Sequence, residues 1–314
     1  MVFSRLISAT GRYELVHWTA ARGLQTLRVG TRSIPFDADI GRDAAGRPVL
    51  TYSQCRTDGR LGGVFPTLDF TRARGCSLRF LVLTQTGTEA LPRTLRLSGA
   101  AGLSLTTPSI RGRAVAAAAS PARGSQNARV LYWRTPATPP IRLRGGTPPT
   151  CPYRSCETPP QSAVEALDLG TTSVAFLWRL TQPGYGAGPG TELRTSALRG
   201  GDGRQFTNAQ GYVSGACGFR QPLSPTVGAG GRVSFLLAQS PCEEVQTTLA
   251  SQAAARLAGI RPAGVLAYGA AWDGSTVYWL AGQPHEESDE NFAIPIPCAR
   301  PGVGCRLVVS QNVR

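Results

Sequence analysis

A short sequence pattern recurs along the chain: a turn that ends in Gly, one or two polar residues, and then an apolar run led by Val. Five clear copies carry this residue as Val49, Val115, Val174, Val233 and Val277. The copies are 66, 59, 59 and 44 residues apart. Repeats of about 40 to 50 residues, lengthened by insertions, are typical of the blades of a β-propeller.

Each repeat resolves into short apolar or β-branched runs that Gly, Pro and Ser separate, which is the pattern of antiparallel strands. The unit around Val115 predicts strands at 105–110, 114–119, 129–134 and 140–144. One Ala- and Gln-rich segment, 245–257, has some helical character. Its place in the repeat requires the third and fourth strands of a unit, so we predict strands there.

The sequence therefore predicts an all-β fold, a single propeller of six blades with four antiparallel strands each. The expected blades cover, approximately, residues 1–36, 37–101, 102–150, 163–210, 220–260 and 261–314. A seventh blade is the alternative if the N-terminus is truncated. The first and last units each lack a fourth strand, so we expect the termini to close the ring and protect the sheet edges.

The charge of the chain is one-sided. All 33 basic residues are Arg, against 19 acidic residues, for a formal net charge of +14. Such an excess fits a polyanionic partner, and it also fits the codon usage of a GC-rich genome. The Arg residues are scattered, so a dedicated nucleic-acid surface is not expected. No apolar stretch of about 18 residues predicts a membrane span.

The eight cysteines form no CxxC pair, and the chain contains only two His residues. Both observations favour disulfides over zinc ligation. Their places between the expected strands predict the pairs Cys55–Cys76, Cys151–Cys156, Cys217–Cys242 and Cys298–Cys305, all on one face. Disulfides indicate a secreted or extracytoplasmic protein. No signal peptide is visible, so we expect the sequence to begin after, or inside, a longer precursor. Eight reduced cysteines in the cytoplasm are the alternative.

Three carboxylates are candidates for a binding site at the mouth of the central channel. Asp37 and Asp39 begin an expected first strand, the strand that lines the channel, and Asp168 lies at the matching strand end two blades later. Trp272, next to Asp273-Gly274, is a candidate as an exposed turn residue. The alternative for the Asp residues is hydrogen bonding within turns and at strand ends.

Two turn segments resemble the "Ser-Pro-Asp-Gly, then hydrophobic strand" motif of secreted TolB-like and WD-repeat-like β-propellers. The stretch 39–49 is a lengthened version, and Trp272-Asp273-Gly274-Ser275-Thr276-Val277 is a tighter one. The chain is also similar to secreted actinobacterial propellers. The resemblance implies a propeller architecture and carries no chemistry by itself.

The catalytic inventory is small: there is no Lys, no G-x-S-x-G elbow, and His17 and His285 are the only histidines. We expect no metal and no cofactor. The main functional hypothesis is a monomeric, non-catalytic binding or scaffold propeller that contacts a protein or glycan ligand through the disulfide-stapled loops. The alternatives are a hydrolase or lyase that uses carboxylates at the channel mouth, and a polyanion binder driven by Arg.

Overall fold

The fold is described from a computed structural model of the chain. The structure describes residues 1–19, 21–62, 67–84, 91–122, 128–143, 161–181, 190–200, 204–208, 219–228, 231–240, 246–252, 257–260, 266–273, 276–282, 288–289, 292–293 and 306–310. The regular elements in these residues are all β-strands. In the same residues there is no helix with the length and hydropathy to cross a lipid bilayer.

The strands form six successive antiparallel sheets, which we number one to six in chain order, and two short hairpins. Sheet one contains β1 (Val2–Ile7), β2 (Arg12–Thr19) and β3 (Gly23–Thr26); sheet two contains β4 (Asp39–Arg42), β5 (Pro48–Gln54), β8 (Ser77–Val82) and β9 (Arg93–Thr94). Sheet three contains β10 (Leu103–Arg111), β11 (Ala114–Pro121), β12 (Arg129–Trp133) and β13 (Ile141–Leu143); sheet four contains β14 (Gln161–Leu169), β15 (Ser173–Thr181), β16 (Gly190–Ala197) and β17 (Arg204–Asn208).

The C-terminal part of the chain continues the same succession. Sheet five contains β18 (Phe219–Val227), β19 (Val233–Ser240), β20 (Gln246–Gln252) and β21 (Leu257–Ile260); sheet six contains β22 (Leu266–Asp273), β23 (Thr276–Gly282) and β26 (Arg306–Ser310). The hairpins are β6 (Arg60–Gly62) with β7 (Thr67–Asp69), and β24 (Ser288–Asp289) with β25 (Phe292–Ala293). Within the segment 245–257, residues 246–252 form β20 and residue 257 begins β21, so its described residues are strand, as its place in the repeat predicts.

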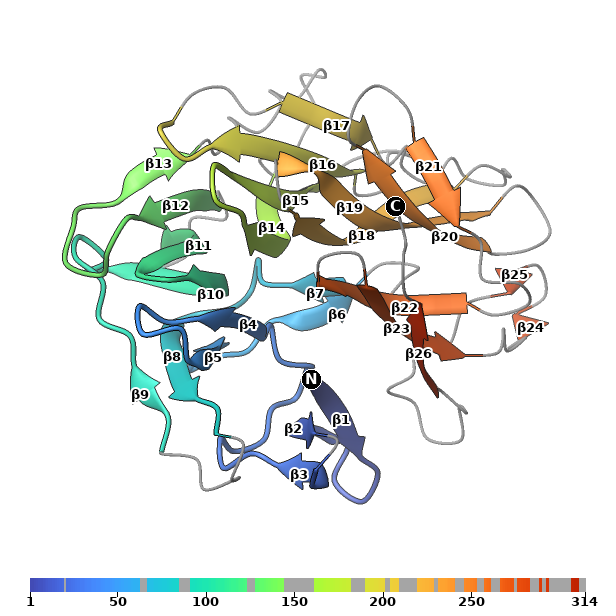
Figure 1. Ribbon diagram of the computed structural model, residues 1–314, viewed down its shortest axis with the longest axis horizontal. Coiled ribbons are helices and arrows are strands. Elements are labelled where there is room, and N and C mark those ends of the chain that lie inside the picture. Colours follow the sequence, from blue (N-terminus) through green and yellow to red (C-terminus); the bar gives the residue numbers. More distant parts are fainter. Residues whose placement is uncertain are drawn as a thin grey trace.

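The six sheets follow one another around a common centre (Figure 1). From sheet two onward, the first strand of each sheet packs on the first strand of the next sheet, in the order β4, β10, β14, β18 and β22. Among the strand pairs of the described residues, none joins sheet six to sheet one. The expected ring closure between the termini is thus not formed there by strand pairing.

The hydrophobic cores lie between neighbouring sheets. In β11 alternate side chains serve two different cores: Ala116 and Ala118 face sheet four, whereas Val115 and Ala117 face sheet two. Successive side chains of a strand point to opposite faces, so a strand covered on both faces must be apolar throughout. This explains the continuous apolar run of β11, in which five consecutive residues are buried.

A disulfide joins Cys55, which follows β5, to Cys76, which precedes β8. The bond closes the loop that carries the β6–β7 hairpin. The N–H of Cys76 donates to Ser104 Oγ, and its carbonyl accepts the N–H of Leu105, each at 3.0 Å, so the stapled loop is held against the start of β10. The other six cysteines lie outside the described residues, and their pairing stays a prediction.

Candidate functional site

Polar side chains on the first strands bind the backbone of the neighbouring sheet. Ser109 Oγ on β10 accepts the N–H of Leu169 on β14 at 3.1 Å. Asp168 Oδ2 on β14 in turn accepts the N–H of Val227 on β18 at 2.5 Å. Both bonds join a residue to the one about 60 positions later, the period of the repeat. They satisfy backbone donors that strand pairing within a sheet leaves free.

Asp39 extends this series by one sheet and meets the same serine. Its Oδ2 on β4 accepts the N–H of Ile110 on β10 at 3.3 Å, and its carboxyl group also hydrogen-bonds Ser109. The Ser109 hydroxyl lies 3.5 Å from Asp168 Oδ1 on the other side. One hydroxyl from sheet three therefore separates two half-buried carboxylates from sheets two and four.

The two carboxyl groups titrate as a pair. Burial and the negative charge of Asp168 raise the pKa of Asp39 to about 7, against the opposing hydrogen bonds from Ser109 and from the N–H groups of Ile110 and Ile40. Like charges in a low-dielectric site cannot both ionise cheaply, so one proton is retained. Near neutral pH Asp39 is therefore partly protonated, whereas an isolated carboxyl group would be fully ionised.

Asp168 is the better stabilised anion of the pair. Burial raises the pKa of Asp168 as well, but the N–H groups of Val227 and Leu169 and the positive charge of Arg111 act in the opposite direction. Hydrogen bonds to the charged form and a nearby cation both favour a carboxylate. The environment thus acts differently on the two carboxyl groups: Arg111 and two N–H groups oppose the raised pKa of Asp168, whereas the charge of Asp168 adds to the raised pKa of Asp39.

The backbone that presents these groups is irregular in a repeated way. The pairing of β10 with β11 shifts between Thr106 and Ser109, and Thr107 has φ +45°. In β18 the corresponding shift includes Ser224 at φ +47°. Positive φ is uncommon for non-Gly residues and marks a strained position. Both residues precede Pro in a Thr/Ser-Pro-Ser/Thr sequence, Thr107-Pro108-Ser109 and Ser224-Pro225-Thr226.

Two glycines allow the sheets to approach each other at this level. A Cβ atom on Gly41, in β4, would lie 1.8 Å from the carbonyl oxygen of Ile110. A Cβ atom on Gly170, next to β14, would lie 2.5 Å from Val227 Cγ1. Any side chain at either position would push neighbouring sheets apart. The close approach brings the carboxylates within reach of the next sheet.

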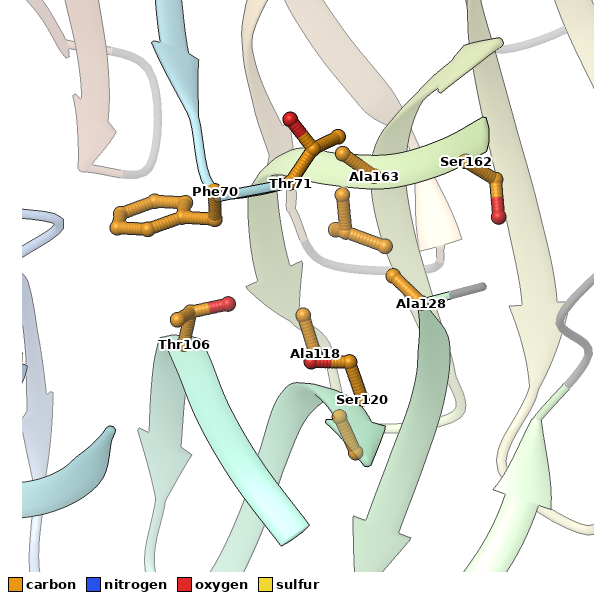
Figure 2. A pocket seen from close by; sticks show the side chains of 10 residues that line it. Phe70, Thr71, Thr106, Ala118, Ser120, Ala128, Ser162 and Ala163 are labelled. Atoms are coloured by element: carbon orange, nitrogen blue, oxygen red, sulfur yellow. The ribbon is translucent and has the colours of Figure 1, made fainter. Parts of the chain in front are cut away.

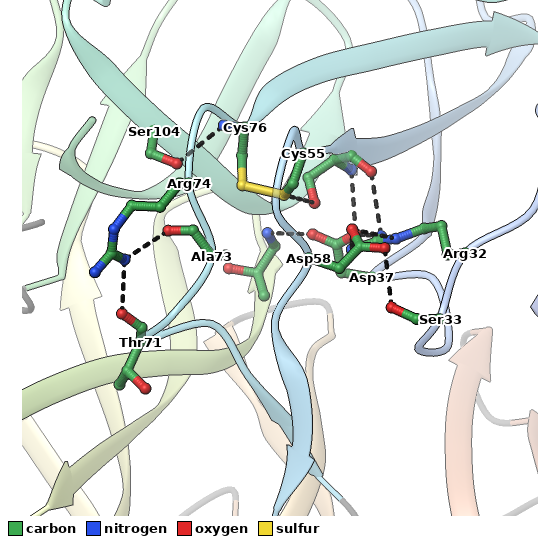
Figure 3. The surroundings of a disulfide bond; sticks show 12 residues. Arg32, Ser33, Asp37, Cys55, Asp58, Thr71, Ala73, Arg74, Cys76 and Ser104 are labelled. Atoms are coloured by element: carbon green, nitrogen blue, oxygen red, sulfur yellow. Dashed lines mark hydrogen bonds and ion pairs between the residues drawn. A yellow bond between two sulfur atoms is a disulfide. The ribbon is translucent and has the colours of Figure 1, made fainter. Parts of the chain in front are cut away.

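Asp37 lies two residues before Asp39 but belongs to a different cluster, beside the disulfide (Figure 3). Its carboxylate accepts Arg32 Nη1 at 2.9 Å, the N–H of Ser53 at 3.1 Å and the N–H of Thr107 at 2.7 Å. The Asp37 side chain is 1% exposed and that of Arg32 is 6% exposed. Asp37 is therefore fully occupied in holding sheets two and three together.

The structure thus brings together two of the residues that the sequence analysis places at the channel mouth, Asp39 and Asp168. It adds Ser109 and Arg111, which the sequence analysis does not single out. The repeated Thr/Ser-Pro-Ser/Thr sequence is the signal that could have identified Ser109. The side chain of Trp272 lies outside the described part of the structure.

A small pocket lies between the stapled loop and the start of the first strands, apart from the carboxylate pair. It is lined by Phe70, Thr71, Thr106, Ala118, Ala119, Ser120, Ala128, Ser162, Ala163 and Val164 (Figure 2). Its free volume of about 20 Å³ holds about one water molecule. Among the described residues, no group of three or more His, Cys, Asp and Glu side chains could hold a metal ion.

Comparisons with known proteins give no family for this chain. A scan against protein-family models finds no match, and no curated protein matches the sequence. The TolB-like and WD-repeat-like resemblance therefore stays an expectation.

Several solved structures are similar in shape at very low identity. A puromycin-hydrolysing peptidase of Mycobacterium tuberculosis is 12% identical over 90% of this chain, with a TM-score of 0.44, and the match spans 42% of that protein. A polysaccharide lyase of family PL25, an ulvan lyase, is 9% identical over 96% of this chain and 76% of its own, with a TM-score of 0.49. A periplasmic gluconolactonase of Pseudomonas aeruginosa is 12% identical over 98% of both chains, with a TM-score of 0.36.

Proposed function

We propose that the chain is an acid–base hydrolase or lyase whose reactive groups are Asp39 and Asp168. The observation that carries the proposal is the carboxylate pair itself. Two half-buried carboxylates from different sheets flank the Ser109 hydroxyl, and burial and mutual repulsion raise the pKa of Asp39 to about 7. Perturbed pKa values cluster at functional sites, and a pair of interacting carboxyl groups is a recurrent form of acid–base site.

The two residues have complementary roles in this proposal. Asp39 is the general acid: it is partly protonated near neutral pH and gives its proton to the leaving oxygen. Asp168, which Arg111 and two N–H groups stabilise as an anion, is the general base. In a hydrolase Asp168 takes a proton from the attacking water, and in a lyase it takes a proton from the carbon next to an acyl group.

The fold around this site is, in our proposal, a six-bladed propeller with one blade for each of sheets one to six. Successive sheets with cores between them and first strands toward a common centre support it. The Cys55–Cys76 bond supports an extracytoplasmic location. A monomer is the simplest assembly, since the described sheets bury their apolar faces against one another.

A second candidate function is ligand binding by the stapled loop, without catalysis. The observation that favours it is the rigidity of this loop. Besides the disulfide, Asp69 in β7 accepts the N–H and hydroxyl of Thr71 at 2.9 and 2.6 Å and pairs with Arg60 at 2.8 Å. Rigid loops on a sheet scaffold are common binding elements. Loss of ligand capture on deleting residues 60–69, with ligand capture unaffected in Asp39→Asn, would identify this function.

The enzyme proposal is tested by screening the purified protein on acidic and neutral polysaccharides and on ester and lactone substrates. We expect new reducing ends from a hydrolase, or a conjugated product that absorbs in the ultraviolet from a lyase. The Asp39→Asn and Asp168→Asn variants should each lose at least about 100-fold in kcat. Glu14→Gln, which alters only an ion pair with Arg5 in sheet one, is the matched control and should keep full activity.

The pH profile tests the assigned roles. Because a general acid must be protonated, activity of the wild-type protein should fall as the pH rises through about 7, the raised pKa of Asp39. Turnover that survives in both Asn variants would refute the proposal. So would a profile that rises through this range.

A further inference from the structure

Exposed arginines gather at the turns that follow the first strands. Arg42 ends β4, Arg111 ends β10 and Arg113 follows it, and Arg232 precedes β19. Arg199 lies just after β16 in sheet four. All five side chains are exposed, and we call this set the arginine rim. It spans sheets two to five, the same sheets that supply and flank the carboxylate pair.

Contacts between the turns bring together the turns of sheets two and three, and those of sheets four and five. The N–H of Gly112 donates to the carbonyl of Arg42 at 2.7 Å, which joins the turns of sheets two and three. The N–H of Leu198 donates to the carbonyl of Thr172 at 3.0 Å, which brings Arg199 beside the first turn of sheet four. A Cβ on Gly231 would lie 3.9 Å from the Thr172 hydroxyl, so the turn of sheet five adjoins it too.

The positive charge of the rim is largely uncompensated. No rim arginine forms an ion pair with a carboxylate within the part of the chain that the structure describes. The acidic residue of the same turns, Asp43, is already paired with Arg47 at 2.7 Å. Arg111 acts electrostatically on Asp168. The rim thus brings five arginines that have no carboxylate partner among the described residues to the sheets that supply and flank the carboxylate pair.

We propose that the arginine rim binds an acidic polysaccharide and delivers it to the carboxylate pair. This inference rests on the proposed hydrolase or lyase function, because it names the substrate class for that site. Guanidinium groups pair with carboxylate and sulfate groups in bidentate geometry. A ring of them around the reactive groups binds successive charged sugars on either side of the bond to be cleaved.

Two observations favour a polysaccharide over nucleic acid. Single strands are bound by aromatic platforms that stack on the bases. Among the described residues, the exposed aromatic side chain is Trp18 on β2, in sheet one, whereas the rim lies on sheets two to five. The Cys55–Cys76 disulfide also indicates an oxidising compartment, where acidic polysaccharides are abundant and nucleic acid is not the usual ligand.

The test compares two triple variants that lose the same charge. Arg42→Gln/Arg113→Gln/Arg232→Gln removes rim cations. The control, Arg22→Gln/Arg28→Gln/Arg129→Gln, removes three exposed arginines from sheets one and three outside the rim. Binding to immobilised polygalacturonate and to heparin is measured against salt concentration, with neutral dextran and duplex DNA as further probes.

We expect the rim variant to bind polygalacturonate or heparin about tenfold more weakly than wild type at moderate salt, with a shallower salt dependence. The control variant should bind as wild type does, and dextran should not bind. Equal losses in both triple variants, or tighter binding of duplex DNA than of either polysaccharide, would overturn the inference.

A variant of the catalytic pair separates this inference from the proposed function. Asp39→Asn should bind acidic polysaccharide at least as well as wild type, because it adds no negative charge to the site, while turnover is lost. If the wild-type protein shows rim-dependent binding but no turnover, the proposed enzyme function is refuted and the proposed binding surface stands. If the protein turns over a neutral substrate, and the rim variant does so at the same rate, the enzyme function stands and the proposed substrate class is refuted.

Discussion

Replacing Asp37 by Ala removes a buried carboxylate that accepts three hydrogen bonds. The substitution leaves the N–H groups of Ser53 and Thr107 buried without an acceptor, and each such group costs about 1 to 3 kcal/mol. It also leaves the buried guanidinium of Arg32 with Asp58, at 3.1 Å, as its remaining charged partner. Breaking a buried pair typically costs about 3 to 5 kcal/mol. We expect Asp37→Ala to lower the free energy of unfolding by about 5 kcal/mol, the sum of the lower ends of these ranges.

The assay is urea unfolding with the disulfide intact, followed by tryptophan fluorescence. Asp58→Ala is the matched control: it removes the more exposed partner of the same guanidinium and should cost about 1 kcal/mol. The double variant Arg32→Met/Asp37→Leu removes both charges but still strands two N–H groups, so it should cost about 2 kcal/mol. A loss below about 1 kcal/mol for Asp37→Ala, or equal losses for Asp37→Ala and Asp58→Ala, would refute this reasoning.

Three further predictions concern stability. Replacing both Cys55 and Cys76 by Ser opens a loop with a sequence separation of 21. The double replacement should lower the free energy of unfolding by about 3 kcal/mol in the same assay. An unchanged free energy of unfolding would refute the stabilising role of this disulfide. Gly41→Ala should cost about 3 kcal/mol, since its Cβ would lie 1.8 Å from the Ile110 oxygen; an unchanged urea midpoint would contradict this close approach. Because the folded pKa of Asp39 is raised to about 7, its contribution to stability is present below about pH 4 and is lost as the pH rises to about 7. Asp39→Asn should remove this dependence of stability on pH. The same pH dependence in the wild-type protein and in Asp39→Asn would count against the raised pKa of Asp39.

The repeat pattern predicts the strands well because it is a local signal. The Val residue that leads the second strand is almost completely buried in four successive sheets: Val49, Val115, Val174 and Val233. Each copy needs the same buried, β-branched residue after the same turn. The position of a segment in the repeat therefore predicts its secondary structure better than its amino-acid composition does. This is why the Ala- and Gln-rich segment 245–257 is correctly predicted as strand.

The candidate site is predictable only in part, because it depends on contacts between sheets. The repeat predicts that carboxylates on the first strands face a common region. The repeat does not predict that Asp39 and Asp168 meet at Ser109, or that Asp37 pairs with Arg32. Asp37 lies just before β4 and Asp39 begins it, and the two side chains bind different partners. Proton sharing depends further on burial and on the N–H groups of the next sheet, which a sequence pattern does not encode.

The most direct test of the account is a carboxyl-¹³C NMR titration of Asp39, because it needs no substrate. The account predicts that Asp39 titrates near pH 7 in the wild-type protein. In Asp168→Asn the pKa of Asp39 should fall, because the repulsion from the neighbouring carboxylate is removed. A wild-type pKa close to the ordinary value of 3.8, unchanged in Asp168→Asn, would contradict the shared proton and with it the proposed acid–base site.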